Sequence, residues 1–424
     1  MMKENVFQIL KERGFIYQTT DDAAIEKLLG KKKVTCYIGF DATSDSLHVG
    51  NLVPVMGLVH MQRCGHRPIA LLGGGTTMVG DPSGKTEMRQ LLTPKEITAY
   101  GERFRPQFER YLSFKNDGGL MLNNAEWLLP LNYIEFLRDV GRHFSVNRML
   151  TAESVKQRLE MGLSFLEFNY MLLQAYDFYV QARNYDCEIQ MGGQDQWGNI
   201  VAGVDLTRRM LGKQVYGMTF PLITTSSGEK FGKSAGNAVW LDKKKTSVFD
   251  FYQYWRNVDD RDVERYLGLF TLLPMEEVKR LPNESINRAK EILAFEITRM
   301  NHGKEEAVGA YTASVKQFGP SDPEGKVATS SEIADVHLDV DSSIPIFTLP
   351  KGNIADGIWI VKLFVDAGFC KSNGEARRLI QQGGAYVNDA VVEDENLELT
   401  SKALVDGELM LRAGKKRIKR VVFI

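Results

Sequence analysis

Hydrophobic and polar positions in the first half of the chain follow an alternation of strand and helix. Apolar β-rich runs predict strands, and an apolar stripe at helical spacing predicts a helix between the first two of them. The strands are expected at residues 34–40, 67–72 and 187–191, and the helix at 49–64. This alternation predicts an α/β fold with a Rossmann-like, doubly wound parallel sheet over residues 1–222.

The remaining chain changes character several times after that domain. Residues 223–246 form a glycine-containing loop and connector, and residues 247–318 show helical patterns with few strand signals. Residues 319–353 carry four of the 13 prolines and an acidic excess, which is typical of a linker. A compact α+β pattern resumes over residues 354–424, so a small third domain is expected there.

Composition restricts the class of protein. The 424 residues include 43% hydrophobic and 25% charged residues, which is ordinary for a globular chain and excludes a disordered or collagen-like one. No apolar stretch approaches the roughly 20 residues of a membrane-spanning helix, and the charged start does not fit a secretory signal. The four cysteines are scattered, which argues against a disulfide framework or a CxxC metal site. We therefore expect a cytoplasmic protein.

The first chemical motif, DATSDSLHVGN, lies between the first strand and its helix at residues 41–51. A histidine at a helix start, here His48, can donate to a phosphate oxygen while the first-turn amides favour the anion. Gly50 leaves room for a purine or ribose beside the backbone. A purely structural helix start, capped by Asp45 or Ser46, explains the motif equally well.

The second motif, GEKFGKS at residues 228–234, is a basic loop flanked by glycines. Lys230 and Lys233 can close over a polyphosphate and neutralise charge on a departing pyrophosphate. Alone the motif is weak, but HxGN followed by KFGKS resembles the HIGH and KMSKS signatures of class I aminoacyl-tRNA synthetases. Asn51 replaces the last histidine of HIGH, and because asparagine can donate a hydrogen bond, we expect altered strength rather than a lost role.

Residues 80–86, GDPSGKT, resemble a phosphate-binding P-loop. The spacing fails because Val79 stands where that motif needs glycine, and Pro82 removes a backbone donor. A P-loop nucleotidase is therefore rejected. Asp81 and Lys85 are still expected near a strand end, where they could meet a substrate amine and a phosphate.

Two further segments place polar groups near predicted strand ends. Tyr170, Gln174 and Asp177 stand at i, i+4 and i+7 of a helical pattern, so one helix face presents a phenol, an amide and a carboxylate. A polar ligand pocket is favoured, and a buried structural network is the less favoured alternative. In GGQDQWGN at residues 192–199, Asp195 suits a pair of ribose hydroxyls, and the alternative is a helix cap.

Together these motifs and YIGFD at residues 37–41 resemble bacterial tyrosyl-tRNA synthetases, and the likeness extends to the last residues. The resemblance implies a tyrosine–tRNA ligase that activates L-tyrosine with Mg-ATP to tyrosyl-adenylate and pyrophosphate. It then transfers tyrosine to the 3′-terminal ribose of tRNA(Tyr). The family also implies a homodimer that the tRNA bridges, with no protein-bound metal or organic cofactor and no editing domain.

The resemblance implies functional roles for individual residues of this chain. Positions that match the family's catalytic, phosphate-handling residues are Thr43, His48, Asn51, Lys85, Lys230 and Lys233. Positions that match its tyrosine-binding residues are Tyr37, Asp41, Asp81, Tyr170, Gln174, Asp177 and Gln196. Positions that match its ATP-binding residues are Gly39, His48, Gly50, Gly193, Asp195, Lys230, Phe231, Gly232, Lys233 and Ser234. Ile38 departs from members that place a cysteine against the ribose, so we expect one ATP contact of those members to be missing here.

The carboxyl-terminal segment resembles an S4-type RNA-binding domain at residues 369–388. The expected RNA-binding cations are Arg377, Arg378, Lys415, Lys416, Arg417, Lys419 and Arg420. The whole chain has a net charge of −1, which by itself argues against a nucleic-acid partner. Residues 351–424 nevertheless carry a small basic excess, with five of their 12 cations in residues 415–420. RNA binding is therefore favoured over a solvated charged face.

Three other functions are alternatives to this one. A class I synthetase for another amino acid, tryptophan being the nearest, would not need Asp177 opposite Tyr37. A small nucleotidyltransferase would lack the carboxyl-terminal RNA-binding segment. A non-enzymatic RNA-binding protein that kept the fold is disfavoured because His48, Lys230, Lys233 and the pocket residues are all present.

Overall fold

A computed structural model describes residues 4–83, 92–160, 162–226, 231–234, 237–336, 346–355, 357–388, 390–405, 407–414 and 417–424. The chain forms two compact units. The first comprises Met1–Ser247, Val258–Arg280 and Met300–His302, and the second comprises Val248–Asn257, Leu281–Arg299 and Gly303–Ile424.

A mostly parallel sheet organises the first unit. Its strands, in spatial order, are β1 (Gln18–Thr19), β6 (Tyr216–Phe220), β5 (Cys187–Gly193), β2 (Thr35–Phe40), β3 (Arg67–Leu72) and β4 (Leu120–Asn123). The three strands predicted from the sequence are confirmed as β2, β3 and β5. The short edge strand β1 differs from the predicted pattern because it pairs with β6 in the antiparallel direction, whereas the other neighbours are parallel.

The order of the strands reverses between β2 and β5. From β2 the chain continues through β3 and β4 on one side, whereas β5 and β6 lie on the other. Loops that leave two such strands in opposite directions open a crevice beyond their carboxyl ends. The residues after Phe40 and after Gly193 therefore face a ligand-sized opening.

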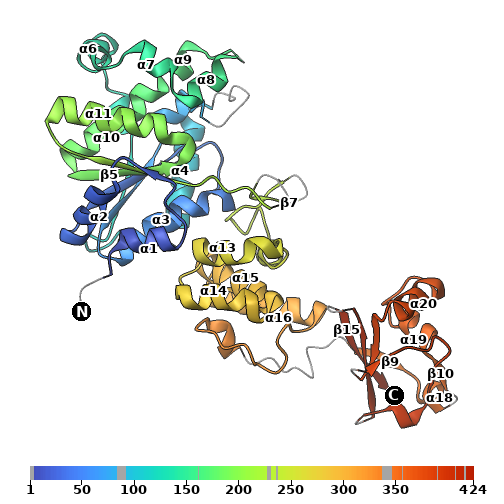
Figure 1. Ribbon diagram of the computed structural model, residues 1–424. Coiled ribbons are helices and arrows are strands. Elements are labelled where there is room, and N and C mark those ends of the chain that lie inside the picture. The colour runs from blue at the N-terminus through green and yellow to red at the C-terminus, as the bar shows by residue number, and fades with distance from the viewer. Residues whose placement is uncertain are drawn as a thin grey trace. The chain divides into compact units, whose positions relative to one another are not determined.

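Helices cover both faces of this sheet (Figure 1). On one face α3 (Leu52–Arg63) packs against β2, β3 and β5, and α1 (Val6–Glu12) packs against α3. On the other face α10 (Tyr170–Asn184) and α11 (Trp197–Leu211) pack against each other and against β5. The predicted helix at 49–64 is confirmed as a short 3₁₀ turn, Val49–Asn51, that leads directly into α3.

The remaining helices before residue 222 lie around this core. They are α2 (Asp22–Lys31), α4 (Pro94–Phe108), α5 (Ala125–Leu128), α6 (Tyr133–Asp139), α7 (Val146–Leu150), α8 (Glu153–Leu159) and α9 (Phe165–Phe168). A short hairpin follows from β7 (Lys233–Ser234) and β8 (Asn237–Ala238).

The predicted helical region is present. Its helices are α12 (Val248–Arg256), α13 (Val263–Phe270), α14 (Met275–Glu284), α15 (Ile286–His302) and α16 (Lys304–Phe318). The described part of the acidic segment that follows is attached to α15. The N–H of Ser321 donates to Glu291 at 3.1 Å, and the hydroxyl of Ser331 donates to Glu296 at 2.6 Å. Two buried carboxylates thus hold a segment whose composition alone indicated a loose linker.

The carboxyl-terminal part has its own α+β core. Its sheet contains, in order, β12 (Ala390–Val391), β11 (Ala385–Val387), β14 (Glu408–Ala413), β15 (Arg417–Phe423) and β9 (Ile346–Leu349). A second pairing joins β10 (Ile358–Trp359) to β13 (Glu398–Leu399). Its helices are α18 (Lys351–Ala355), α19 (Ile360–Asp366) and α20 (Asn373–Gln381), and α19 and α20 contribute Leu363 and Ile380 to the core.

Candidate active site

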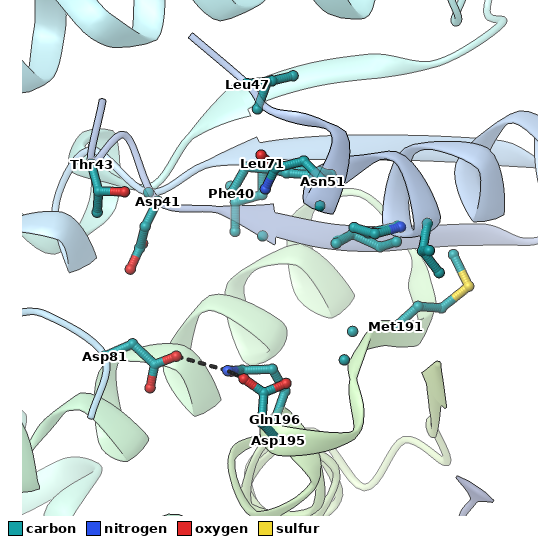
Figure 2. Close-up of a pocket in the computed structure, with 18 of the residues that line it drawn as sticks. Phe40, Asp41, Thr43, Leu47, Asn51, Leu71, Asp81, Met191, Asp195 and Gln196 are labelled. Atoms are coloured by element: carbon teal, nitrogen blue, oxygen red, sulfur yellow. Dashed lines mark hydrogen bonds between the residues drawn. The ribbon is translucent and has the colours of Figure 1, made fainter. Parts of the chain in front are cut away.

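A cavity of about 430 Å³ opens at the carboxyl ends of β2 and β5, where the strand order reverses. Its volume suits a small organic ligand. The predicted site residues that line it are Tyr37, Gly39, Asp41, Thr43, His48, Gly50, Asn51, Asp81, Tyr170, Gln174, Asp177, Gly193, Asp195, Gln196 and Phe231. Residues separated by almost 200 positions thus share one cavity, part of which Figure 2 shows.

A buried carboxylate lines the cavity. Asp177 is 3% exposed, and its two oxygens accept hydrogen bonds from Asn124 at 2.9 Å and from the indole of Trp127 at 2.8 Å. Burial raises the pKa of Asp177 to about 7, and the charge of Asp41 adds to this rise, whereas the two hydrogen bonds oppose it. The site therefore holds a carboxylate that titrates near neutral pH.

Tyr37 on β2 supplies a hydroxyl near this carboxylate. The hydroxyl is buried and has no hydrogen-bond partner among the described residues, and its ring packs against Phe178 at 5.5 Å. Burial raises the pKa of Tyr37 well above its ordinary value, and the charge of Asp177 adds to the rise. A buried hydroxyl rarely stays without a partner, so the pair suits a ligand group that both donates and accepts a hydrogen bond, as a phenol does.

Hydrogen bonds connect several polar side chains that line the cavity, here called the polar network. Tyr170 donates to Asp41 at 3.2 Å. Asn199 donates to Gln174 at 2.9 Å. Gln196 donates to Asp81 at 2.7 Å, and Figure 2 shows these two side chains pointing toward each other. The polar side chains predicted on one face of α10 are Tyr170, Gln174 and Asp177. They therefore form hydrogen bonds with side chains from several other elements of the first unit.

Sequence reasoning missed Asn124, Trp127, Asn199 and Thr76. Asn124 bridges three groups, because it accepts from Gly75 N–H and donates to both Asp177 and Thr76. The available signal was a short apolar run, residues 120–122, followed by two asparagines at a strand end. That run is too short to stand out without knowledge of the sheet.

The HxGN motif forms a compact turn of its own. The N–H of Gly50 donates to Nδ1 of His48 at 3.0 Å, and the N–H of His48 donates to Oδ1 of Asn51 at 3.0 Å. In neutral His48, the proton is therefore on Nε2, and Asn51 keeps its amide NH₂ as a donor. His48 itself caps the turn, rather than Asp45 or Ser46.

Gly50 is required for a reason the sequence did not reveal. A Cβ at this position would lie 2.7 Å from Cε1 and 2.8 Å from Nδ1 of the His48 ring. The imidazole thus lies directly over its own glycine. The sequence predicted that Gly50 leaves room for a nucleotide. In the structure, its missing side chain leaves room for the His48 ring.

The described part of the KFGKS motif contacts this turn. Gly232 has a φ of +86°, and a Cβ there would lie 3.3 Å from the Gly50 nitrogen. Phe231 stacks on Phe270 of α13 with centroids 5.5 Å apart and rings 3° from parallel. Lys85 and Lys230 lie outside the described residues, as do the side chains of Lys233 and Ser234.

The predicted RNA-binding cations have different surroundings. Arg377 is half exposed and lies 3.7 Å from Glu395, and Arg378 is exposed. Arg417 and Lys419 donate at 2.5 Å to the carbonyls of Phe369 and Ala367, and Arg420 pairs with Glu408 at 2.9 Å. Lys415 and Lys416 lie outside the part of the chain that the structure describes.

The described residues contain neither a membrane-spanning helix nor a metal-binding cluster. No helix there is long and apolar enough to cross a bilayer. No group of three or more His, Cys, Asp or Glu side chains there is arranged to hold a metal ion.

The sheet, its cavity and the two signature turns define a class I aminoacyl-tRNA synthetase. The family model for class I tRNA synthetases of tryptophan and tyrosine matches residues 29–319, and a model for the C-terminal domain of tyrosine–tRNA ligases matches residues 339–421. The tyrosine–tRNA ligase of Desulfosudis oleivorans is 53% identical over 427 residues, which cover 99% of each chain. That of Clostridium kluyveri is 50% identical over 99% of each chain.

Solved structures agree with the sequence comparison. A C-terminally truncated mitochondrial tyrosyl-tRNA synthetase from Aspergillus nidulans is 32% identical, with a TM-score of 0.66, over 73% of this chain and 93% of its own. The enzyme of Archaeoglobus fulgidus, solved with L-tyrosine, is 17% identical with a TM-score of 0.54 and covers 72% of this chain and 99% of its own, which shows a shared fold. This chain belongs to the tyrosine–tRNA ligases, so the family resemblance is confirmed and the enzyme uses ATP.

Proposed function

We propose that Tyr37 and Asp177 together recognise the phenol of L-tyrosine. Tyr37 would donate to the phenolic oxygen, and Asp177 would accept the phenolic proton. The observation that carries this assignment is the buried Tyr37 hydroxyl without a partner among the described residues, beside a carboxylate that Asn124 and Trp127 hold in place. Phenylalanine would leave the buried Tyr37 hydroxyl without a partner and would give Asp177 no phenolic proton to accept, which is costly.

We propose that the polar network binds the amino-acid end of the substrate. We assign the ammonium group to Asp81, Tyr170 and Gln174, with Asp41 and Gln196 beside them. The hydrogen bond between Gln196 and Asp81 supports this, because it fixes the Asp81 carboxylate at the cavity wall. An anionic wall of this kind attracts an ammonium and also orients the substrate carboxylate toward the nucleotide.

The first chemical step forms tyrosyl-adenylate. The tyrosine carboxylate attacks the α-phosphorus of Mg-ATP, and pyrophosphate leaves. No general base is needed because that carboxylate is already ionised at pH 7. Thr43, His48, Asn51, Lys85, Lys230 and Lys233 would orient and neutralise the phosphates, which is catalysis by positioning and charge stabilisation.

The nucleoside of ATP would lie along the ends of β2 and β5. Asp195 suits the ribose hydroxyls, and Gly39, Gly50 and Gly193 leave room for close approach. Phe231, Gly232 and Ser234 complete the ATP-binding set as the family implies. In the second step the adenylate acylates the 3′-terminal ribose of tRNA(Tyr).

The carboxyl-terminal part would bind the tRNA. We propose the five-part division predicted from the sequence, with a Rossmann-like catalytic domain at 1–222 and an S4-like RNA-binding domain at 354–424. The exposed Arg377 and Arg378 support RNA contact, together with Lys415 and Lys416. Arg417, Lys419 and Arg420 are assigned a smaller share because their contacts with protein partners, at 2.5–2.9 Å, are closer than the 3.7 Å between Arg377 and Glu395.

A homodimer is supported by exposed apolar side chains of the first unit. Leu129 directly after α5, Ile134 on α6 and Phe165 on α9 are 60%, 69% and 72% exposed. Burial of such side chains against a second copy of the chain would remove apolar surface from water. We place the enzyme in the cytoplasm, consistent with its scattered cysteines and its use of ATP.

Amino-acid-dependent ATP–pyrophosphate exchange tests the phenol site. The parent enzyme should exchange with tyrosine and not with phenylalanine or tryptophan. Asp177→Asn should raise KM for tyrosine by roughly 10- to 100-fold, since hydrogen bonds to charged groups contribute about 1.5–3 kcal/mol, with KM for ATP unchanged. An unchanged KM for tyrosine would refute the assignment of Asp177.

Deletion of residues 351–424 tests the tRNA role separately. The truncated enzyme should keep exchange but lose tRNA charging. Undiminished charging would remove the RNA role from the carboxyl-terminal part. Loss of exchange as well would mean that this part supports the catalytic unit.

A further inference from the structure

Residues 239–241, here called the strap, follow the KFGKS motif and run alongside the HxGN motif. The N–H of Val49 donates to the carbonyl of Val239 at 2.9 Å, and the N–H of Leu241 donates to the carbonyl of Leu47 at 2.9 Å. His48 and Trp240 are paired between these two bonds in an antiparallel bridge. The strap thereby fixes the backbone on which His48 stands.

The strap is also bonded to the second signature motif. The N–H of Val239 donates to the carbonyl of Gly232 at 2.9 Å. A single short segment therefore hydrogen-bonds to both signature motifs. The separation between the His48 turn and Gly232 is set by backbone bonds that do not depend on a substrate.

The side chain of Trp240 lies against the catalytic imidazole. The rings of His48 and Trp240 meet at 73°, with centroids 6.0 Å apart, which is the favourable edge-to-face geometry of an aromatic pair. The bond from Gly50 to Nδ1 holds one edge of the imidazole, and the indole limits its movement on another side. Trp240 is not among the described residues that line the cavity, so we expect any effect on ATP to act through a neighbour.

An ion pair holds Trp240 in turn. The ammonium of Lys245 lies 4.4 Å from the centroid of the Trp240 ring and pairs with the carboxylate of Asp45. The other oxygen of Asp45 accepts from Arg103 at 2.8 Å. Asp45, Lys245, Trp240 and His48 thus form a closed chain of contacts that begins and ends in the loop before α3.

We propose that Trp240 is a positioning residue for the adenylation step, which holds the His48 imidazole with Nε2 directed at the phosphates of ATP. The physical reason is that one hydrogen bond at Nδ1 still allows the ring to tilt, whereas a second contact on another side restricts the tilt. Misplacement of a catalytic group by about 1 Å can cost on the order of 100-fold in rate. This inference rests on the proposed role of His48 in the same step.

Substitution of Trp240 by leucine and by phenylalanine provides the first test. Trp240→Leu removes the ring, and we expect kcat for tyrosine-dependent ATP–pyrophosphate exchange to fall about tenfold. KM for tyrosine should stay within about twofold, because the tyrosine site does not include the strap. Trp240→Phe keeps an aromatic edge and should retain most of the rate. Tyrosine binding and thermal melting show whether each variant is folded.

A double-mutant cycle with His48→Ala separates positioning from a general structural role. If Trp240 acts through His48, then Trp240→Leu should cause little further loss in the His48→Ala background. A full tenfold loss in both backgrounds would overturn the inference while leaving the role of His48 intact. An unchanged rate in His48→Ala alone would instead refute the proposed function of His48. Loss of folding in both Trp240 variants would assign the residue to stability and so overturn the inference.

Two adjacent lysines give a matched control pair. Lys245→Ala removes the ion pair with Asp45 and the contact between Lys245 and Trp240. It should lower kcat about threefold. This effect is smaller than that of Trp240→Leu because the contact between the rings of Trp240 and His48 remains. Lys244 is exposed on the same turn, and Lys244→Ala should leave exchange unchanged. Equal effects of the two substitutions would show that the chain of contacts through Lys245 does not orient Trp240.

Discussion

The indole N–H of Trp127 donates to one oxygen of the Asp177 carboxylate, and the amide of Asn124 donates to the other. Each oxygen thus has one protein donor and retains acceptor capacity toward a ligand. Without these donors, burial would raise the pKa of the carboxyl further, and the acceptor form would be rarer at neutral pH. Trp127 and Asn124 therefore favour the ionised form of Asp177, which is the form that accepts a hydrogen bond.

Trp127→Phe removes one of the donors. Since the indole hydrogen bond stabilises the carboxylate, its loss should raise the pKa of Asp177 by about one unit. Below the pKa the protonated acid no longer accepts from the phenol, so kcat/KM for tyrosine should fall at a higher pH in the variant. Profiles between about pH 6 and 9 check this shift. If the acidic limbs of the two pH profiles coincide, Trp127 does not affect the pKa of Asp177. KM for ATP serves as the control.

Asp177 should also make the stability of the ligand-free enzyme dependent on pH. Its folded-state pKa of about 7 lies above its ordinary value, so ionisation favours the unfolded chain. The stability it contributes is fully present below about pH 4 and is lost as pH rises toward about 7. Because asparagine does not ionise, Asp177→Asn removes this loss of stability. Melting at about pH 5 and pH 8 should show a smaller decline in the variant than in the parent. Parallel declines would contradict the raised pKa.

Gly50→Ala should disturb catalysis without disturbing tyrosine binding. The added Cβ would lie 2.7 Å from the His48 ring, so the imidazole must rotate away. We expect kcat for exchange to fall on the order of tenfold, with KM for tyrosine unchanged. Gly309 in α16 is a matched control because a Cβ there meets no atom within 4 Å. Gly309→Ala should leave exchange intact and favour the helix by up to about 1 kcal/mol. Full activity in Gly50→Ala would show that the ring has another accessible position.

Ser331→Ala should weaken the attachment of the acidic segment to α15. Glu296 and Ser331 are both buried, so loss of the hydroxyl donor should cost about 1–3 kcal/mol. Limited proteolysis should then cut residues 321–336 faster, while exchange stays unchanged. Ser401→Ala changes an exposed serine of the same unit and should have no such effect. Equal cleavage rates would mean that other contacts hold the segment.

Sequence patterns predicted much of the fold because they are local. A period of two or of 3.6 residues marks a strand or helix within a short window, and β2, β3, β5, α3 and α10 follow such patterns. The stripe of Tyr170, Gln174 and Asp177 was predictable for the same reason, since its spacing follows the turns of a single helix. The antiparallel edge strand was not predictable, because two residues carry no periodic signal.

By itself, then, the sequence determined the α/β order, the signature motifs and the polar face of α10. Only the tertiary structure decided which distant groups support them. Asn124 and Trp127 reach Asp177 across 53 and 50 positions. Trp240 reaches His48 because the strap pairs with the loop before α3. Such contacts follow from the order of the strands and the packing of the helices, and no local window of the chain encodes either.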